Sequence, residues 1–269
     1  MKEALHAAIS SEVARRLGWP DPEAVGVGAR QPDEIEIVGI RLRNGSIVTR
    51  VFDNNLSSCT HFAGYNLGMD RSCGRLELPD RELVYLPGAW TDMPLGVDQG
   101  DPLWLLLADT RISHSFDELS WPAAWSYADW WTKVYRVAEA ESEDYDSIAS
   151  RERRLGIIAG RCLHYIQDMT IPQHRRNEML AYHSETEAQV LKRWETMDGK
   201  KKEALIVQCI AESPTWSPRG LAQGFMVQAT PKVSAWACRR RKLVDQIITK
   251  GLCCTAAALK YLRVGRGTP

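Results

Sequence analysis

Three of the six histidines in this 269-residue chain, His164, His174 and His183, lie within twenty positions of one another. Asp168 follows His164 by four residues, and Glu187 follows His183 by the same interval. Because residues four apart share one face of a helix, each imidazole would lie beside a carboxylate. Neutral imidazole and carboxylate groups are ligands that zinc takes, and a site with three protein ligands keeps one position open for water or substrate. The spacing therefore favours a metal cluster.

A hydrogen-bonded arrangement without metal is the alternative. One histidine and one carboxylate at this spacing more often form a simple hydrogen bond than a metal site. Two such pairs with a third histidine between them change the balance, because burial without a cation would leave several desolvated carboxylates. Each of these groups would cost several kcal/mol. A metal cluster is therefore the preferred interpretation.

The elements that would position these residues are helices. Apolar residues recur every four positions over 3–18, and this segment ends on Gly18, a typical helix stop. From residue 122 onward the chain has the periodicity of successive helices, with a break expected at Pro172. Within the helix that carries His164, Cys162 lies about 200° away round the axis, so we expect it to face away from the site.

A loop-rich insert separates the first helix from the others. Gly and Pro are frequent between about 20 and 105, and apolar and polar residues alternate around Asn44-Gly45, which predicts a small β-hairpin. No internal repeat or long flexible linker divides the chain. We therefore expect a mainly α fold, organised as a single helical-bundle domain over 1–269.

Composition limits the partners. The chain has 34 Lys and Arg and 34 Asp and Glu residues, so its formal net charge is zero and we expect no stable nucleic-acid complex. No uninterrupted apolar segment of about eighteen residues occurs and the first residues lack the apolar core of a signal peptide, so we expect no membrane insertion and a cytoplasmic protein. Seven cysteines without a CxxC pair favour reduced thiols. The oligomeric state stays open.

The run HYIQDMTIPQH, from His164 to His174, followed by His183 and Glu187, resembles the signature of the zinc-dependent phospholipase C and single-strand-specific zinc nuclease superfamily. This resemblance implies an all-α fold with a trinuclear zinc cluster at the floor of a cleft. The family also uses a histidine in the first helix, an aspartate in a following loop, and a histidine before an aromatic residue. Corresponding residues are present in this chain: His6, Asp33, and His61 before Phe62.

Carried over position by position, the resemblance implies three zinc ions with shared ligands. The first ion would be held by Asp33, His61, His164 and Asp168. The second would be held by His174, His183 and Glu187. The third would be held by His6, the bridging Asp168, and the amine and carbonyl of Met1. Met1 stands where exported family members expose a tryptophan after signal cleavage, and His114 fits none of these positions.

Such a cluster suits phosphoester hydrolysis. Two divalent ions about 3.5–4 Å apart activate a bridging water and clamp an in-line displacement at phosphorus. By resemblance, Asp168 would bridge two ions, Asp33 would be both ligand and general base, and Phe62 would stack on a substrate. The family's base-reading acid and choline-contacting tyrosine are replaced by Gly64 and Glu34, so neither nucleobase nor choline recognition is expected.

Two other functions remain open at this stage. The same metal scaffold could serve a small-molecule hydrolysis, elimination or cyclisation in a biosynthetic pathway, since function resides in the site and not in the fold. In a non-enzymatic alternative, zinc would have only a structural role and would hold together the helices of a binding module. Open coordination positions would favour catalysis, whereas complete sets of protein ligands would favour a structural role.

Overall fold

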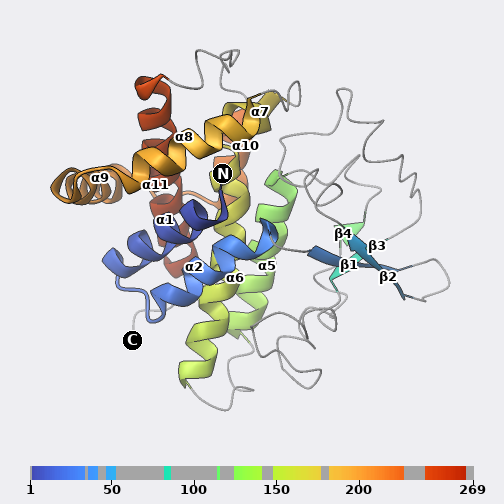
Figure 1. The fold of residues 1–269 in the computed structure, drawn as a ribbon. Coiled ribbons are helices and arrows are strands. Elements are labelled where there is room, and N and C mark those ends of the chain that lie inside the picture. Colours follow the sequence, from blue (N-terminus) through green and yellow to red (C-terminus); the bar gives the residue numbers. More distant parts are fainter. Residues whose placement is uncertain are drawn as a thin grey trace.

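The structure is a computed structural model, and it describes residues 2–33, 36–41, 47–52, 82–85, 114–115, 124–140, 148–176, 182–226 and 240–264. Most of these residues are helical, which confirms the prediction of a mainly α fold. The helices form one group, and the short strands lie to one side of it (Figure 1). The division of the chain into one domain stays a prediction.

The helical group is formed by segments from both ends of the chain. Its helices are α1 (Glu3–Arg16), α2 (Pro22–Arg30), α5 (Ala124–Ala140), α6 (Ile148–Asp168), α7 (Pro172–Arg176), α8 (His183–Glu195), α9 (Gly199–Glu212), α10 (Pro218–Met226) and α11 (Arg241–Val264). The predicted stop of the first helix is confirmed, because Gly18 has a φ of +69° that favours glycine. The predicted break is also confirmed, since α6 ends before Pro172 and α7 begins there.

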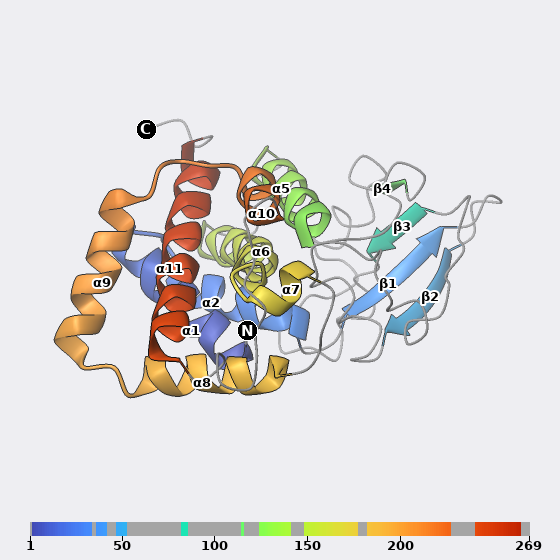
Figure 2. The same cartoon turned by 90° about the horizontal axis from the view of Figure 1, so that it is seen from above.

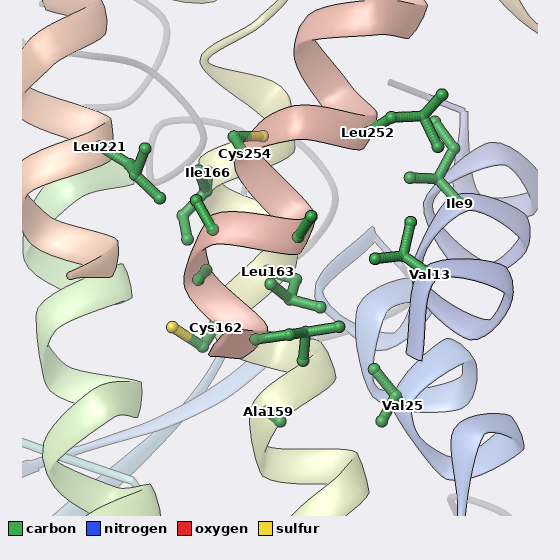
Figure 3. Packing of buried hydrophobic residues seen from close by; sticks show 14 of the residues in the cluster. Ile9, Val13, Val25, Ala159, Cys162, Leu163, Ile166, Leu221, Leu252 and Cys254 are labelled. Carbon is green, nitrogen blue, oxygen red and sulfur yellow. The ribbon is translucent and has the colours of Figure 1, made fainter. Parts of the chain in front are cut away.

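Helix α6 is the central element of this group. It contacts α1, α2, α5, α10 and α11, and Figure 2 shows it surrounded by these helices. Buried apolar side chains from several helices meet around it (Figure 3), among them Ile9, Val13, Leu163, Ile166 and Leu252. Because close-packed side chains hold α6 on several sides, polar groups at its C-terminal end have fixed positions.

Two glycines allow α2 and α6 to cross very closely. A Cβ atom at Gly28 would lie 2.0 Å from the backbone oxygen of Ile157, and one at Gly160 would lie 2.1 Å from that of Val25. Neither distance is sterically possible, and backbone atoms within packed helices cannot move aside cheaply. Glycine is therefore required at both positions for this crossing.

The strands form one small antiparallel sheet. They are β1 (Glu36–Arg41), β2 (Ile47–Phe52), β3 (Glu82–Tyr85) and β4 (His114–Ser115), in the order β2-β1-β3-β4. In the first pair Glu36 lies opposite Phe52 and Arg41 opposite Ile47. The turn predicted at Asn44-Gly45 lies outside the described residues, as does most of the predicted loop-rich insert.

Two further features bear on the sequence analysis. Within the described part of the chain, no helix combines the length and the apolar character needed to cross a membrane. The described cysteines carry free thiols: Cys162, Cys209, Cys253 and Cys254. Cys162 contacts the backbone oxygen of Ala128 on α5, at 3.3 Å, so its predicted orientation away from the histidines is confirmed.

Candidate metal centre

Side chains from four helices meet at the C-terminal end of α6. The first helix contributes one histidine, α6 contributes a histidine and an aspartate, and the short α7 and the start of α8 contribute the others. The ligand atoms fall into two groups, within each of which they lie no more than 4.8 Å apart, so that each group could hold a metal ion. The first group is His6, His164 and Asp168, and the second is His174, His183 and Glu187.

In the first group, one carboxylate lies between two imidazoles. Asp168 Oδ1 lies 3.1 Å from His6 Nε2, and Asp168 Oδ2 lies 3.3 Å from His164 Nε2. The two rings stack with their centroids 4.1 Å apart, and all three side chains are buried. Each carboxylate oxygen thus faces a different histidine, which is the arrangement of a bridging ligand.

The opposite ring nitrogens lie within hydrogen-bonding distance of oxygen atoms. His164 Nδ1 lies 2.8 Å from the backbone oxygen of Ala29, which can only accept, so Nδ1 carries the proton and donates it. His6 Nδ1 lies 2.7 Å from Oε1 of Gln167. Burial, followed by the neighbouring His164, lowers the pKa of His6, which favours its neutral form. In a neutral ring with the proton on Nδ1, Nε2 presents a lone pair.

A cation placed between each Nε2 lone pair and the Asp168 carboxylate would be more favourable than direct contact between the lone pair and the carboxylate. A nitrogen lone pair that faces an anionic oxygen is repelled unless a proton or a metal ion lies between them. A tetrahedral zinc ion at about 2.0–2.1 Å from a nitrogen and an oxygen would separate the two atoms by about 3.3 Å. The separations on either side of Asp168 are 3.1 and 3.3 Å. The donor set of the first group therefore fits zinc.

In the second group, three donor atoms point to one place. Glu187 Oε1 lies 3.1 Å from His183 Nε2 and 3.6 Å from His174 Nε2, and the two nitrogens are 2.6 Å apart. The side chain of His183 is 18% exposed, whereas those of His174 and Glu187 are nearly buried. This group therefore combines three ligand atoms with a side that reaches the solvent.

Residues beside the histidines of the second group fix the position of α7 relative to the start of α8. Gln173 Nε2 donates to Thr186 Oγ1 at 2.8 Å and to the backbone oxygen of Tyr182 at 3.4 Å. Tyr182, directly before His183, has a φ of 61°, a left-handed conformation that is unfavourable for a tyrosine. Because Gln173 also adjoins His174, these contacts fix α7 and the start of α8 relative to each other.

One histidine connects the two groups. His174 Nδ1 lies 3.8 Å from Asp168 Oδ2, while its Nε2 belongs to the second group. The two groups are therefore neighbours across one imidazole ring. On the outer side, Glu187 Oε2 lies 3.8 Å from the ammonium group of Lys2.

The protonation states suit metal ligands. Burial alone would raise the pKa of Asp168, but the positive amino terminus and the surrounding histidines outweigh it and hold that pKa well below its ordinary value. The pKa of Glu187 is lowered in the same way, against burial, by the amino terminus, His174 and His183. Burial lowers the pKa of His174 to about 4. Metals require anionic carboxylates and neutral imidazoles, and these pKa directions favour the required forms of Asp168, Glu187, His6 and His174.

Acidification should destabilise the metal-free protein between about pH 6.5 and pH 4. An unfolded histidine titrates near 6.5, whereas the pKa of folded His174 is about 4, so within this window only the unfolded chain binds that proton. The free energy of unfolding should therefore fall with pH, by up to about 3 kcal/mol at pH 4. Urea denaturation at several pH values in the presence of a chelator measures this slope. A His174→Asn variant with an equally steep slope would contradict the assignment.

Several predicted site residues are not brought into these groups by the described structure. Met1, His61 and Phe62 lie outside the described residues, so their roles stay predictions. The backbone of Asp33 ends the 3-10 helix η1 (Gln31–Asp33), which contacts α6, but its side chain lies outside the described residues. The ligand set of the first predicted zinc ion is therefore described for His164 and Asp168 only.

The cleft implied by the resemblance is not described either. A cavity of about 360 Å³ lies between α1, α8 and α9, lined in part by Ser11, Trp194 and Lys202. None of the six residues of the two groups lines it. It is therefore separate from the candidate metal centre.

Sequence reasoning missed two buried polar residues beside the site. Gln167 on α6 is buried and contacts His6. Arg161, one turn before His164, is also buried, and its Nε donates to Gln31 Oε1 at 2.7 Å while its guanidinium lies 4.8 Å from the ring of Trp131. The signal that could have revealed them is the presence of large polar residues among the apolar positions of the helix that carries His164.

Comparisons with known proteins yield no match. No known family matches the chain, and no curated protein or solved structure does so either. The basis for inferring a function is therefore the chemistry of the two groups, together with the motif that connects them.

Proposed function

We propose that this protein is a zinc-dependent hydrolase that cleaves a phosphoester, either a phosphodiester or a phosphomonoester. We also propose that its fold is of the zinc-dependent phospholipase C type. The observation that carries the proposal is the position of Asp168, whose two oxygens lie beside the Nε2 atoms of His6 and His164. A carboxylate so placed can hold two cations next to each other. The adjacent second group provides ligands for a further ion.

Zinc bound at these groups would supply a water of lowered pKa and a Lewis acid for a phosphoryl oxygen. The residues of the chain hold the ligands in the required state. Hydrogen bonds at Nδ1 orient the rings of His6 and His164, and burial excludes competing water from Asp168. By resemblance, Asp33 would act as general base and complete the first site together with His61, Met1 would complete the third, and Phe62 would contact the substrate.

Catalysis is favoured over a structural role for zinc by the ligand count and type. Structural sites are closed by four protein ligands, commonly with several thiolates. Among the described residues, the second group offers three ligand atoms, none of them sulfur, and reaches the solvent through His183. Such a site leaves one coordination position for water or for a phosphate oxygen.

The proposal is tested by elemental analysis of the purified protein and by hydrolysis assays. The substrates are bis-p-nitrophenyl phosphate, p-nitrophenyl phosphate, phosphatidylcholine vesicles and single-stranded DNA. We expect bound zinc, hydrolysis that a chelator abolishes and zinc restores, and, in His164→Ala, loss of hydrolysis together with a lower zinc content, because the second group stays intact. His114→Ala is the matched control, because that histidine fits no ligand position and should keep both.

Two outcomes would contradict the proposal in different ways. A protein without bound metal even after incubation with zinc would refute the metal centre. Bound zinc without hydrolysis of any of these phosphoesters would refute the proposed phosphoesterase activity. It would favour a small-molecule reaction on the same metal scaffold, since function resides in the site and not in the fold.

A further inference from the structure

A single buried amide connects the first group to the C-terminal helix. Gln167 lies on α6 directly before Asp168 and is fully buried. Its Oε1 faces His6 Nδ1 at 2.7 Å, and its Nε2 lies 2.8 Å from both Ser10 Oγ and Thr255 Oγ1. The amide thus contacts α1 on one side and α11 on the other.

The direction of the amide follows from Thr255. The Thr255 hydroxyl donates its only hydrogen to the backbone oxygen of Gly251, at 2.7 Å. Its oxygen can therefore only accept from Gln167, so the atom of Gln167 that faces it must be the NH₂ group. The carbonyl oxygen of Gln167 must then face His6. The positions of the oxygen and nitrogen of a side-chain amide are assigned from its hydrogen bonds. Here the assignment starts from the backbone oxygen of Gly251, which can only accept.

This direction decides which nitrogen of His6 carries the proton. Because Gln167 Oε1 can only accept, Nδ1 of neutral His6 must donate, and Nε2 presents its lone pair toward Asp168. If the amide were reversed, its NH₂ would face Nδ1 and the proton would move to Nε2. That tautomer could not bind a cation through Nε2.

We propose that Gln167 is a positioning residue that keeps His6 in its metal-binding tautomer, and that Thr255 on α11 sets the direction of the Gln167 amide. This inference rests on the proposed metal centre and goes beyond its ligands. His164 has the same requirement, but there the acceptor is the backbone oxygen of Ala29, which cannot reverse. A side-chain amide can reverse, so the tautomer of His6 also depends on Thr255, which fixes the direction of the amide.

Thr255→Val and Thr255→Ser form the decisive pair of variants. Valine has nearly the shape of threonine but removes the acceptor, so the Gln167 amide becomes free to reverse against Ser10, whose hydroxyl can donate or accept. Serine keeps the hydroxyl and should preserve the wild-type behaviour. Gln167→Met removes the acceptor of His6 itself. Removal of such an outer partner typically weakens metal binding about 10–100-fold.

Two readouts are needed. The first is the ¹⁵N NMR spectrum of His6 in metal-free protein, assigned with a His6→Asn variant, which reports the tautomer without any metal. We expect the Nδ1–H form in the wild type and Thr255→Ser, and a population of the Nε2–H form in Thr255→Val and Gln167→Met. The second is the zinc affinity of the first group, measured by chelator competition. It should fall at least about tenfold in Thr255→Val and Gln167→Met and stay unchanged in Thr255→Ser.

The second group serves as the internal reference, because Gln167 does not contact it in the described structure, and its affinity should not change. An unchanged His6 tautomer or unchanged affinity of the first group in a folded Thr255→Val protein would overturn the inference. Should Gln167→Met fail to fold, the threonine pair still decides the outcome. A wild-type protein that binds no zinc would instead refute the proposed function, so the two failures are distinguishable.

Discussion

Replacement of Asp168 by asparagine should abolish zinc binding at the first group and reduce phosphoester hydrolysis by more than about a hundredfold. The carboxylate lies beside both His6 and His164, and asparagine keeps its size while it removes the charge. Loss of an outer partner of a metal ligand costs about 10–100-fold, so loss of the bridging ligand itself should cost more. Zinc content by elemental analysis and the rate on bis-p-nitrophenyl phosphate measure the two effects.

The same variant separates a metal centre from a simple hydrogen-bonded cluster. In the metal-free protein the Asp168 carboxylate faces two nitrogen lone pairs, whereas the asparagine NH₂ group could donate to one of them. We therefore expect metal-free Asp168→Asn to be as stable as metal-free wild type, or more stable by about 1 kcal/mol. Added zinc should raise the melting temperature of the wild type by more than that of Asp168→Asn, which keeps only the second group.

Asp245→Asn is the matched control. Asp245 is a partly exposed carboxylate on α11 that pairs with Arg193, and its loss should leave zinc content unchanged. If Asp168→Asn instead lowered the free energy of unfolding of the metal-free protein by several kcal/mol, the carboxylate would be the partner of protonated histidines. That result would favour the hydrogen-bonded alternative over the metal centre.

The second large effect concerns the crossing of α2 and α6. Gly160→Ala should lower the free energy of unfolding by about 3 kcal/mol or more, because the new Cβ would lie 2.1 Å from the backbone oxygen of Val25. For a chain of this size that corresponds to a fall in melting temperature of roughly 10 °C. Thermal denaturation followed by circular dichroism measures it.

The same variant should also disturb the candidate metal centre. Ala29 on α2 orients His164 through its backbone oxygen, so helices that are forced apart would lengthen this hydrogen bond. Gly199→Ala is the control, because at that position a Cβ would meet no atom within 4 Å in the described structure. Its melting temperature should stay equal or rise slightly, as alanine favours a helix over glycine. An unchanged melting temperature in Gly160→Ala would contradict the close crossing.

The sequence was informative wherever the signal is local. The four-residue spacing of His164 and Asp168, and of His183 and Glu187, correctly predicts that each histidine lies beside its carboxylate on one helix. The stop at Gly18 follows from the same kind of short-range rule. Placing His6 beside Asp168 required the family resemblance, because no rule of spacing connects two helices so far apart in the chain.

The parts that could not be predicted depend on the packing of helices. The direction of the Gln167 amide follows from a hydroxyl on α11, and its role is visible only when α1, α6 and α11 are placed together. The sequence does not distinguish Gly28 and Gly160 from other glycines, since a close approach is a property of two packed helices and not of either sequence. The roles of Asp33 and His61 remain predictions because the side chain of Asp33 and all of His61 lie outside the described residues.

The connection between His6 and Gln167 spans 161 positions, and it has a consequence for biosynthesis. A growing polypeptide cannot complete the first group until α6 has been made and has docked against α1, so any cation held there would be bound late in folding. Contacts of such high sequence separation also slow folding, since the intervening chain must be closed first. Until then the imidazoles and carboxylates of the nascent protein would be exposed to other ions, so the order in which ions arrive would affect the maturation of the proposed metal centre.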